Sequence, residues 1–208
     1  LPVTVVERGD RLLKTFPGAL AQYAAENLAR MGIQVQAKCS VESADADGIR
    51  LSSRVEPGPG MLIWTAGRAA ADGPHMTGAR RGESGRIVVD GCLRAGGCCY
   101  AAGDAAAAPG PDGPLRMGVQ FARVTGRAAG RNARRLLAGE EPEPCRPRDP
   151  GHLVPMANFL SCGVILGRPM TGRLPTLLHY AMSLLRTPGV GGRARLARQL
   201  LASVRRTR

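Results

Sequence analysis

The spacing of apolar residues divides the first third of the chain into predicted strands and helices. Residues 3–6 form an apolar run typical of a buried strand, and residues 33–36 alternate apolar and polar side chains as a half-buried strand does. Between them, residues 19–31 repeat apolar side chains at helical spacing and end at a glycine. Residues 41–55 contain a hairpin turn sequence, and residues 61–64 form another apolar strand. This order fits the second half of an α/β nucleotide-binding domain whose first βα unit is missing.

A second group of elements follows. Residues 85–90 are predicted as a strand, residues 93–98 as a turn region, and residues 99–102 as a short buried strand that stops at a Gly-Asp pair. A loop rich in glycine and proline leads to a helix predicted over residues 117–137. Four prolines within residues 140–150 then indicate a linker.

The last part of the chain is apolar and strongly basic. Residues 153–156 and 163–166 are predicted as strands, and residues 176–185 and 193–204 as helices. The net charge is +13, and all 16 acidic residues lie at or before Asp149. The final 59 residues therefore contain nine arginines and no acid, so a nearly balanced body carries a basic tail.

The final predicted helix is amphipathic. The apolar residues of this helix fall on one face: Leu196, Leu200, Leu201 and Val204. Its arginines lie largely on other faces: Arg195, Arg198, Arg205 and Arg206. A basic amphipathic helix can lie on an anionic membrane surface. The alternative is a helix packed on the body of the protein with solvated arginines. No nucleic acid is expected as a partner, because the aromatic side chains that stack on bases are missing here.

Length and composition narrow the class of protein. The 208 residues suffice for one domain or two small ones, and the chain begins at Leu1 in what reads as a strand interior, which predicts a piece of a longer protein. No secretory signal is visible, so a cytoplasmic location with reduced thiols is expected. The six cysteines form no C-x2-C pair, and no metal site is predicted. The adjacent Cys98 and Cys99 leave redox activity open, beside the alternative of a buried strand.

The Gly103-Asp104 pair is the strongest candidate for chemistry. A carboxylate at the carboxyl end of a buried strand is costly unless it has a partner, and this edge of an open α/β sheet is where ligands bind. Gly103 would let the backbone pass close to a ligand. The following helix would direct N–H groups near Gly118 toward negative charge. Gln120 would lie in its first turn, although it could equally be an exposed helix residue.

Glu7 is a second candidate, because it follows the strand at residues 3–6. An acid at this strand end accepts hydrogen bonds from the adenine ribose of NAD and repels the 2′-phosphate of NADP. The alternative is a solvated acid in a turn. Arg8 and Arg11 lie close by in sequence and could instead accommodate that phosphate.

Thr65-Ala66-Gly67 is a third candidate, since its small residues follow the strand predicted over residues 61–64. A planar cofactor or a neighbouring backbone could approach such a segment closely. The alternative is a plain tight turn. Trp64 is expected to pack in the core rather than stack on a ligand.

Three segments stand in the order and spacing of a known family. Residues 3–13, 63–67 and 100–104 resemble the FAD-dependent pyridine nucleotide-disulfide oxidoreductases, and most of all the type II NADH dehydrogenases. The resemblance covers about residues 2–139. It implies that Asp104 binds a hydroxyl of the ribityl chain of FAD, and that Thr65-Ala66-Gly67 leads the chain from a nicotinamide domain back to the FAD domain.

The chain also departs from that pattern. The type II enzymes often carry a pair of glutamines at the quinone pocket, where this chain has Val124 and Thr125, so that only Gln120 remains. No G-x-G-x-x-G loop follows a strand, although such loops hold the pyrophosphates of FAD and NAD. These 208 residues alone are therefore expected to bind FAD weakly or not at all.

Residues and resemblance together predict an α/β fold: part of a flavoprotein with two Rossmann-like dinucleotide-binding domains, plus a helical carboxyl-terminal extension. Residues 1–67 would belong to the NAD(P)H-binding domain and residues 68–139 to the FAD-binding domain. Residues 140–150 would form a linker, and residues 151–208 the extension.

The predicted activity is hydride transfer from NADH to FAD, followed by electron transfer to an acceptor, with a membrane quinone as the candidate. The implied cofactors are FAD and NAD(P)H. A homodimer and a peripheral position on the inner face of the cell membrane are left open. The alternative is a non-catalytic fragment that only packs, or binds a membrane surface, through its basic tail.

Overall fold

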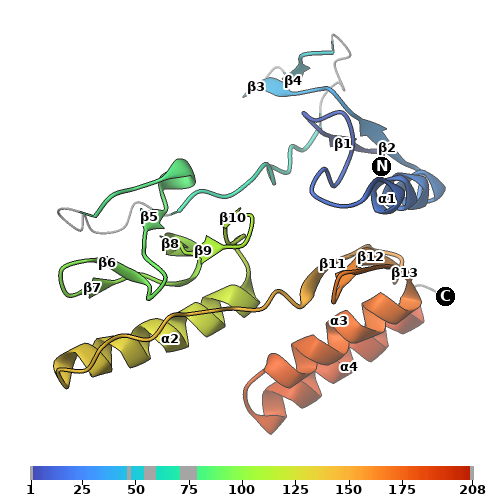
Figure 1. Cartoon of the computed structure of the whole chain (residues 1–208). Helices are drawn as coiled ribbons and strands as arrows, with labels where there is room; N and C mark the ends of the chain where they lie inside the picture. The colour runs from blue at the N-terminus through green and yellow to red at the C-terminus, as the bar shows by residue number, and fades with distance from the viewer. Residues whose placement is uncertain (1, 46–47, 54–59, 71–78, 207–208) are drawn as a thin grey trace. The chain divides into compact units, whose positions relative to one another are not determined.

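The computed structural model describes residues 2–45, 48–53, 60–70 and 79–206. The chain divides into two compact units: unit 1 consists of Leu1–Ile63 and Pro150–Arg208, and unit 2 consists of Trp64–Asp149. Both units contain helices and strands (Figure 1). The predicted α/β fold class is therefore confirmed.

Unit 1 begins with the predicted strand, helix and strand. β1 (Val3–Val6) pairs in parallel with β2 (Ile33–Gln36), and α1 (Gly18–Arg30) connects them. β3 (Val41–Asp45) and β4 (Gly48–Leu51) form the predicted hairpin, although residues 46 and 47 of its turn lie outside the described residues. The apolar periodicity located α1 to within one residue at each end, because the side chains it buries recur at helical spacing.

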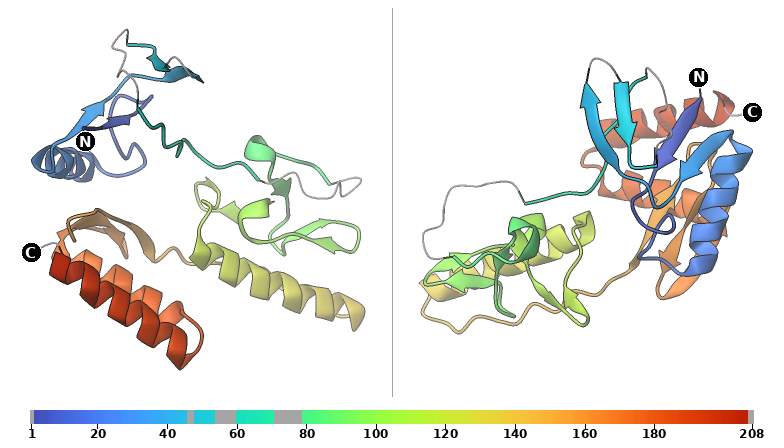
Figure 2. Two further views of the ribbon diagram at one scale, coloured as in Figure 1. Left: turned by 180° about the vertical axis from the view of Figure 1, so that it is seen from behind. Right: turned by 90° about the horizontal axis from the view of Figure 1, so that it is seen from above.

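The carboxyl-terminal part of unit 1 is an antiparallel sheet followed by two helices. The predicted strands are confirmed as β11 (Gly151–Pro155) and β12 (Ser161–Ile165), and an unpredicted third strand, β13 (Arg168–Gly172), pairs with β12. The two predicted helices are confirmed as α3 (Arg173–Arg186) and α4 (Val190–Arg206). They pack side by side, as both views of Figure 2 show.

This sheet packs on α1. Phe16, Leu20 and Ala24 form a buried cluster with Cys162 of β12. The ring of Phe16 lies 4.2 Å from that of His152 in β11. Contacts between residues far apart in sequence therefore join the two segments of unit 1.

Unit 2 consists of short strand pairs and one long helix. β5 (Ile87–Val88) pairs in parallel with β8 (Ala106–Ala107), while β6 (Arg94–Gly96) pairs antiparallel with β7 (Cys99–Tyr100) and β9 (Pro109–Gly110) antiparallel with β10 (Gly113–Pro114). The short helices η1 (Glu83–Gly85) and η2 (Gly103–Ala105) precede β5 and β8. The long helix, α2 (Val119–Leu137), buries Phe121, Ala128 and Ala129 in the core of the unit.

The strand predicted over residues 61–64 is wrong, because these residues have no regular structure. Met61, Ile63 and Trp64 are exposed, so Trp64 is not a core residue. A strand needs a neighbour to pair its backbone N–H and C=O groups. None of the strands in the described part of the chain pairs with this segment.

The buried strand predicted over residues 99–102 is also wrong in extent and environment. Only β7 is a strand there; its partner β6 lies where a turn was predicted, and Cys99 is exposed. Cys98 is exposed as well, so the buried-strand interpretation of these two thiols does not hold. Glycines at positions 96 and 97 both adopt positive φ, which allows the tight hairpin instead.

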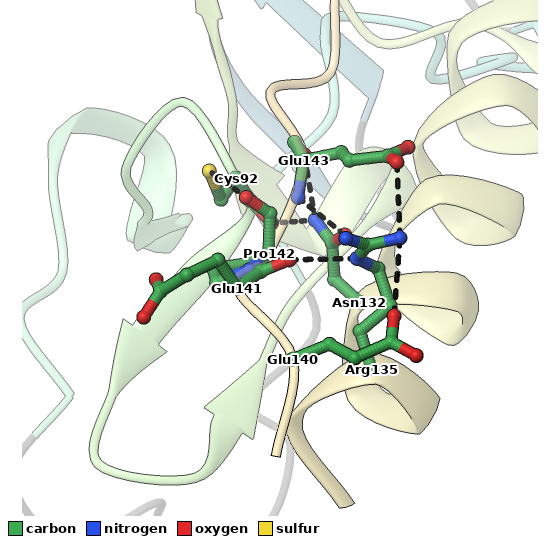
Figure 3. Close-up of polar contacts among 7 residues, drawn as sticks. All are labelled: Cys92, Asn132, Arg135, Glu140, Glu141, Pro142 and Glu143. Carbon is green, nitrogen blue, oxygen red and sulfur yellow. Dashed lines mark hydrogen bonds and ion pairs between the residues drawn. The ribbon is translucent and has the colours of Figure 1, made fainter. Parts of the chain in front are cut away.

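Residues 140–143, which we call the acidic strap, lie against α2 although the predicted linker has no regular structure (Figure 3). Asn132 of α2 is 1% exposed, and its amide nitrogen donates to the carbonyls of Cys92 (2.9 Å) and Glu143 (2.8 Å). Arg135 forms ion pairs with Glu140 at 3.2 Å and with Glu143 at 3.0 Å. The strap is therefore fixed to the last turns of the helix.

Candidate cofactor-binding site

Asp104 lies in a tight turn next to the amino-terminal end of α2. Gly103 before it adopts a φ of +66°, which side chains disfavour. The N–H of Gly118, the N-cap of α2, donates to Asp104 Oδ1 at 3.0 Å. The side chain of Asp104 is nevertheless 46% exposed. The helix end therefore orients the carboxylate and leaves it accessible to a ligand.

The expected position of Asp104, at the carboxyl end of a buried strand, is wrong. Asp104 belongs to η2, between the antiparallel strand β7 and the parallel strand β8. Since its carboxylate is about half exposed, burial does not force it to find a partner. Asp104 is a candidate ligand-binding residue because of the turn that holds it and the amino-terminal end of α2 beside it.

Thr125 fixes the same turn from inside α2, and sequence reasoning missed it. Its side chain is 2% exposed, and Oγ1 accepts the Gly103 N–H at 2.9 Å while donating to the Phe121 carbonyl at 2.7 Å. Gly103 also lies so close to Ala122 that an added Cβ would be 3.4 Å from the Ala122 Cβ. The turn is therefore attached to the helix both through Thr125 and through Gly118.

Arg68 connects the predicted Thr65-Ala66-Gly67 segment to this site. Its guanidinium pairs with Asp104 Oδ2 at 3.6 Å and donates to the Met117 carbonyl at 3.2 Å. The three residues before it are exposed, and the Gly67 N–H donates to the Thr65 carbonyl at 2.9 Å in a tight turn. Arg68 was missed too, although its place directly after the glycine was the available signal.

Gln120 lies in the first turn of α2, as predicted, and is half-buried. With its amide oxygen facing Arg116, it accepts hydrogen bonds from the two terminal guanidinium nitrogens at 2.7 and 3.2 Å. Arg116 also binds both carboxylate oxygens of Asp149, at 2.8 and 3.2 Å, and its guanidinium carbon lies 5.1 Å from the centre of the Phe121 ring. Gln120 is thus held by a charged cluster at the start of the helix.

Glu7 lies at the carboxyl end of β1 in the parallel pair, as predicted. Its carboxylate accepts the Gly9 N–H at 2.6 Å, which fixes its orientation in the turn. Arg11, the nearby candidate for a 2′-phosphate, instead donates to the carbonyls of Lys14 and Phe16 at 3.2 and 3.1 Å. Arg8 is exposed.

The structure thus brings most of the predicted residues together within unit 2. Asp104, which follows Gly103, accepts the Gly118 N–H, Gln120 lies in the first turn of α2, and the segment at residues 65–67 is linked to the site through Arg68. Glu7 belongs to unit 1.

Cysteine ionisation is altered at three positions. The hydrogen bond to Ser53 Oγ (3.3 Å) lowers the pKa of Cys39, whereas burial raises the pKa values of Cys145 and Cys162. Within the described residues, no cluster of three or more His, Cys, Asp or Glu side chains could hold a metal ion. His75 lies outside the described residues.

The parallel pair β1–β2 joined by α1, and the parallel pair β5–β8 in the unit that contains α2, place the chain in the α/β class. The profile of the pyridine nucleotide-disulphide oxidoreductases matches residues 1–129. The chain belongs to this family, which confirms the resemblance seen in the sequence.

Two curated relatives are similar in sequence. The type II NADH:quinone oxidoreductase of Haemophilus influenzae is 27% identical over 172 residues, which cover 81% of this chain and 39% of the relative. An external alternative NAD(P)H-ubiquinone oxidoreductase, B1, mitochondrial, of Solanum tuberosum is 30% identical over 113 residues, covering 50% and 20%. The chain therefore spans well under half the length of these relatives.

Solved structures show the same fold at low sequence identity. NDH2 from Plasmodium falciparum, in complex with NADH, matches with a TM-score of 0.76 at 14% identity, over 100% of this chain and 59% of that one. A NAD-dependent persulfide reductase from A. fulgidus matches with a TM-score of 0.63 at 18% identity, over 78% and 31%.

Proposed function

We propose that the protein containing this chain transfers a hydride from NADH to FAD and passes the electrons to an acceptor, with a membrane quinone as the candidate. The observation that supports it most is the Gly103-Asp104 turn held at the amino-terminal end of α2. Family membership supports the same activity. We also propose the domain boundaries expected from the sequence. Residues 1–67 would belong to the NAD(P)H-binding domain and residues 68–139 to the FAD-binding domain, with a linker over residues 140–150 and an extension over residues 151–208.

The residues of the turn fit FAD. Asp104 presents a half-exposed carboxylate that can accept a hydrogen bond from a ribityl hydroxyl. Its ion pair with Arg68 is exposed and worth at most about 1 kcal/mol, so a hydroxyl can replace it at low cost. The first turn of α2 contains no acidic residue, so its N–H groups can stabilise negative charge on a reduced ring. When bound, FAD supplies the hydride acceptor and the route to single-electron acceptors.

Glu7 would select the dinucleotide. Its carboxylate can accept hydrogen bonds from both ribose hydroxyls of NADH and would repel a 2′-phosphate. Arg11 donates to backbone carbonyls, so it is not directed toward such a phosphate. The charge of Glu7 and the contacts of Arg11 favour NADH, which the proposal names, and the exposed Arg8 is left as the side chain that would favour NADPH.

The quinone is proposed from the relatives' names and from the surface of α3. Five exposed apolar side chains follow one another at helical spacing along this helix: Leu174, Leu177, Leu178, Met182 and Leu185. In the part of the chain that the structure describes, no helix is long and apolar enough to cross a membrane. We propose instead that α3 and α4 lie on the inner face of the membrane, where a quinone dissolves.

One experiment tests the activity: anaerobic addition of NADH to the full-length protein, followed by a short-chain quinone. The expected result is bleaching of the flavin absorbance by NADH and its return with the quinone. Return with ferricyanide alone would retain the reductase and remove the quinone. A full-length protein that binds no FAD would favour the alternative, a non-catalytic binding module.

A further inference from the structure

Four arginines form a line along the outer face of α2. Arg123, Arg127, Arg131 and Arg134 are separated by four, four and three residues, so they lie on one side of the helix along about 16 Å. This side is opposite the buried one, which carries Phe121, Thr125 and Ala128 among others. All four arginines are exposed, and no described carboxylate forms an ion pair with them.

This arrangement is costly for the helix itself. Like charges four residues apart repel, and α2 contains no acidic residue that would offset them. Three of the arginines, Arg127, Arg131 and Arg134, line an open groove of about 550 Å³ together with Val124 and Gly130. A Cβ added at Gly130 would meet nothing within 4 Å, so the groove is open at this position.

The chain shows what such a helix face can hold. Arg135, the neighbour of Arg134, binds the acidic strap through the carboxylates of Glu140 and Glu143 and donates to the Glu141 carbonyl at 2.6 Å. The strap is an extended segment with three acids among four residues (Figure 3). One arginine of α2 therefore already holds an extended acidic segment by charge and by backbone hydrogen bonding.

We propose that the arginine groove of α2 binds an extended acidic segment of a partner protein. Arginine forks pair with carboxylates and also donate to backbone carbonyls, so the groove matches the chemistry that Arg135 already uses. The interaction does not depend on flavin chemistry, and it is separate from the proposed catalytic function.

A lipid surface fits this face less well. Phe121 of α2 points into the core, and the exposed apolar side chains of the helix, Val119, Val124 and Leu137, are scattered along its length, so the helix has no continuous apolar face to insert among lipids. An exposed apolar face lies on α3 instead.

The test uses a fluorescent peptide of repeated Glu-Glu-Pro-Glu units, with fluorescence anisotropy as the readout. The triple variant Arg127→Gln/Arg131→Gln/Arg134→Gln should bind it about tenfold more weakly than the unaltered protein. Binding to the unaltered protein should weaken as salt is added. Circular dichroism checks that the variant keeps its helices.

The matched control is Arg193→Gln/Arg195→Gln/Arg198→Gln, which removes the same charge from α4, where all three arginines are exposed. The control should keep peptide binding. Equal loss in both variants would mean that net charge alone attracts the peptide, which would overturn the proposal. The proposal would also be overturned if the α2 variant kept peptide binding but lost binding to phosphatidylglycerol vesicles or to single-stranded DNA, while the control variant kept both.

Discussion

Thr125 is a buried polar side chain whose hydroxyl accepts the Gly103 N–H. Thr125→Val keeps the shape of the side chain but leaves that N–H without a partner, so we expect the free energy of unfolding of the chain to fall by about 1–3 kcal/mol. Thr125→Ser retains the hydroxyl and should recover most of the loss. Urea unfolding measures both variants, and a Val variant as stable as the unaltered chain would contradict the role.

Because the turn orients Asp104, the same valine substitution should weaken FAD binding in the full-length protein. We expect the Kd for FAD to rise about tenfold with Thr125→Val and to stay near its original value with Thr125→Ser. Flavin fluorescence titration of the apoprotein separates this effect from stability, provided the titration is run well below the melting temperature. An unchanged Kd would show that Asp104 does not need this support.

Glu7 should set the preference for NADH. Glu7→Gln retains an oxygen for the Gly9 N–H but removes the negative charge, so the repulsion of a 2′-phosphate is lost. We expect kcat/KM for NADPH to rise about tenfold relative to NADH in the full-length protein. Glu26→Gln, an exposed acid on α1, is the matched control and should leave the ratio unchanged. If the ratio of kcat/KM for NADPH to that for NADH also stayed constant in Glu7→Gln, the role of Glu7 would be limited to fixing the turn through the Gly9 N–H.

The residues of the candidate site were only partly predictable. Gly103, Asp104 and Gly118 could be recognised because a glycine and an acid after an apolar segment, before a helix, follow from local backbone needs. Thr125 could not, because its partner Gly103 lies 22 residues away and meets it only when the turn docks on α2. For Arg68 the sequence offered only its place directly after Gly67, since its partner Asp104 lies 36 residues away.

At the scale of elements, the helices were predicted well and the strands less so. The helix predicted over residues 117–137 corresponds to α2 at Val119–Leu137, because its buried residues recur at helical spacing. Strands depend on partners instead. Residues 61–64 have the apolar composition of a strand but no neighbour among the described strands, whereas β13 has few apolar residues and is formed by pairing with β12.

Asn132 should contribute more to the stability of unit 2 than the ion pairs beside it. Asn132→Ala removes two donated hydrogen bonds and the acceptor of the Glu143 N–H at a site that is 1% exposed. We expect a loss of about 2–4 kcal/mol in the free energy of unfolding. Arg135→Gln breaks partly exposed contacts, namely the two ion pairs and the hydrogen bond to the Glu141 carbonyl, and should cost about 1 kcal/mol or less. Equal losses in urea unfolding would mean that the strap is held by charge rather than by Asn132.

At the scale of the whole molecule, the first and last segments of the chain share one unit. From the sequence, residues 151–208 were predicted only as an extension, because no local sequence pattern indicates that β11 and β12 pack on α1. The rings of Phe16 and His152 are in contact although they lie more than a hundred residues apart in sequence, and the side-chain amide of Asn27 donates to Asn158 Oδ1 at 3.1 Å. The helices that follow, α3 and α4, are thereby carried on the unit that contains Glu7.

The exposed face of α3 should bind membranes. Leu177 and Leu185 are 66% and 69% exposed, and burying each in lipid is worth roughly 1–2 kcal/mol, while each arginine near an anionic surface adds about 1 kcal/mol. The unaltered chain should therefore float with phosphatidylglycerol vesicles, and Leu177→Gln/Leu185→Gln should reduce the bound fraction strongly. Leu137→Gln removes a leucine on α2 that is 89% exposed and should have no effect. Flotation that is equal in all three proteins would leave attraction by the basic tail as the cause, because only the apolar contact differs between them.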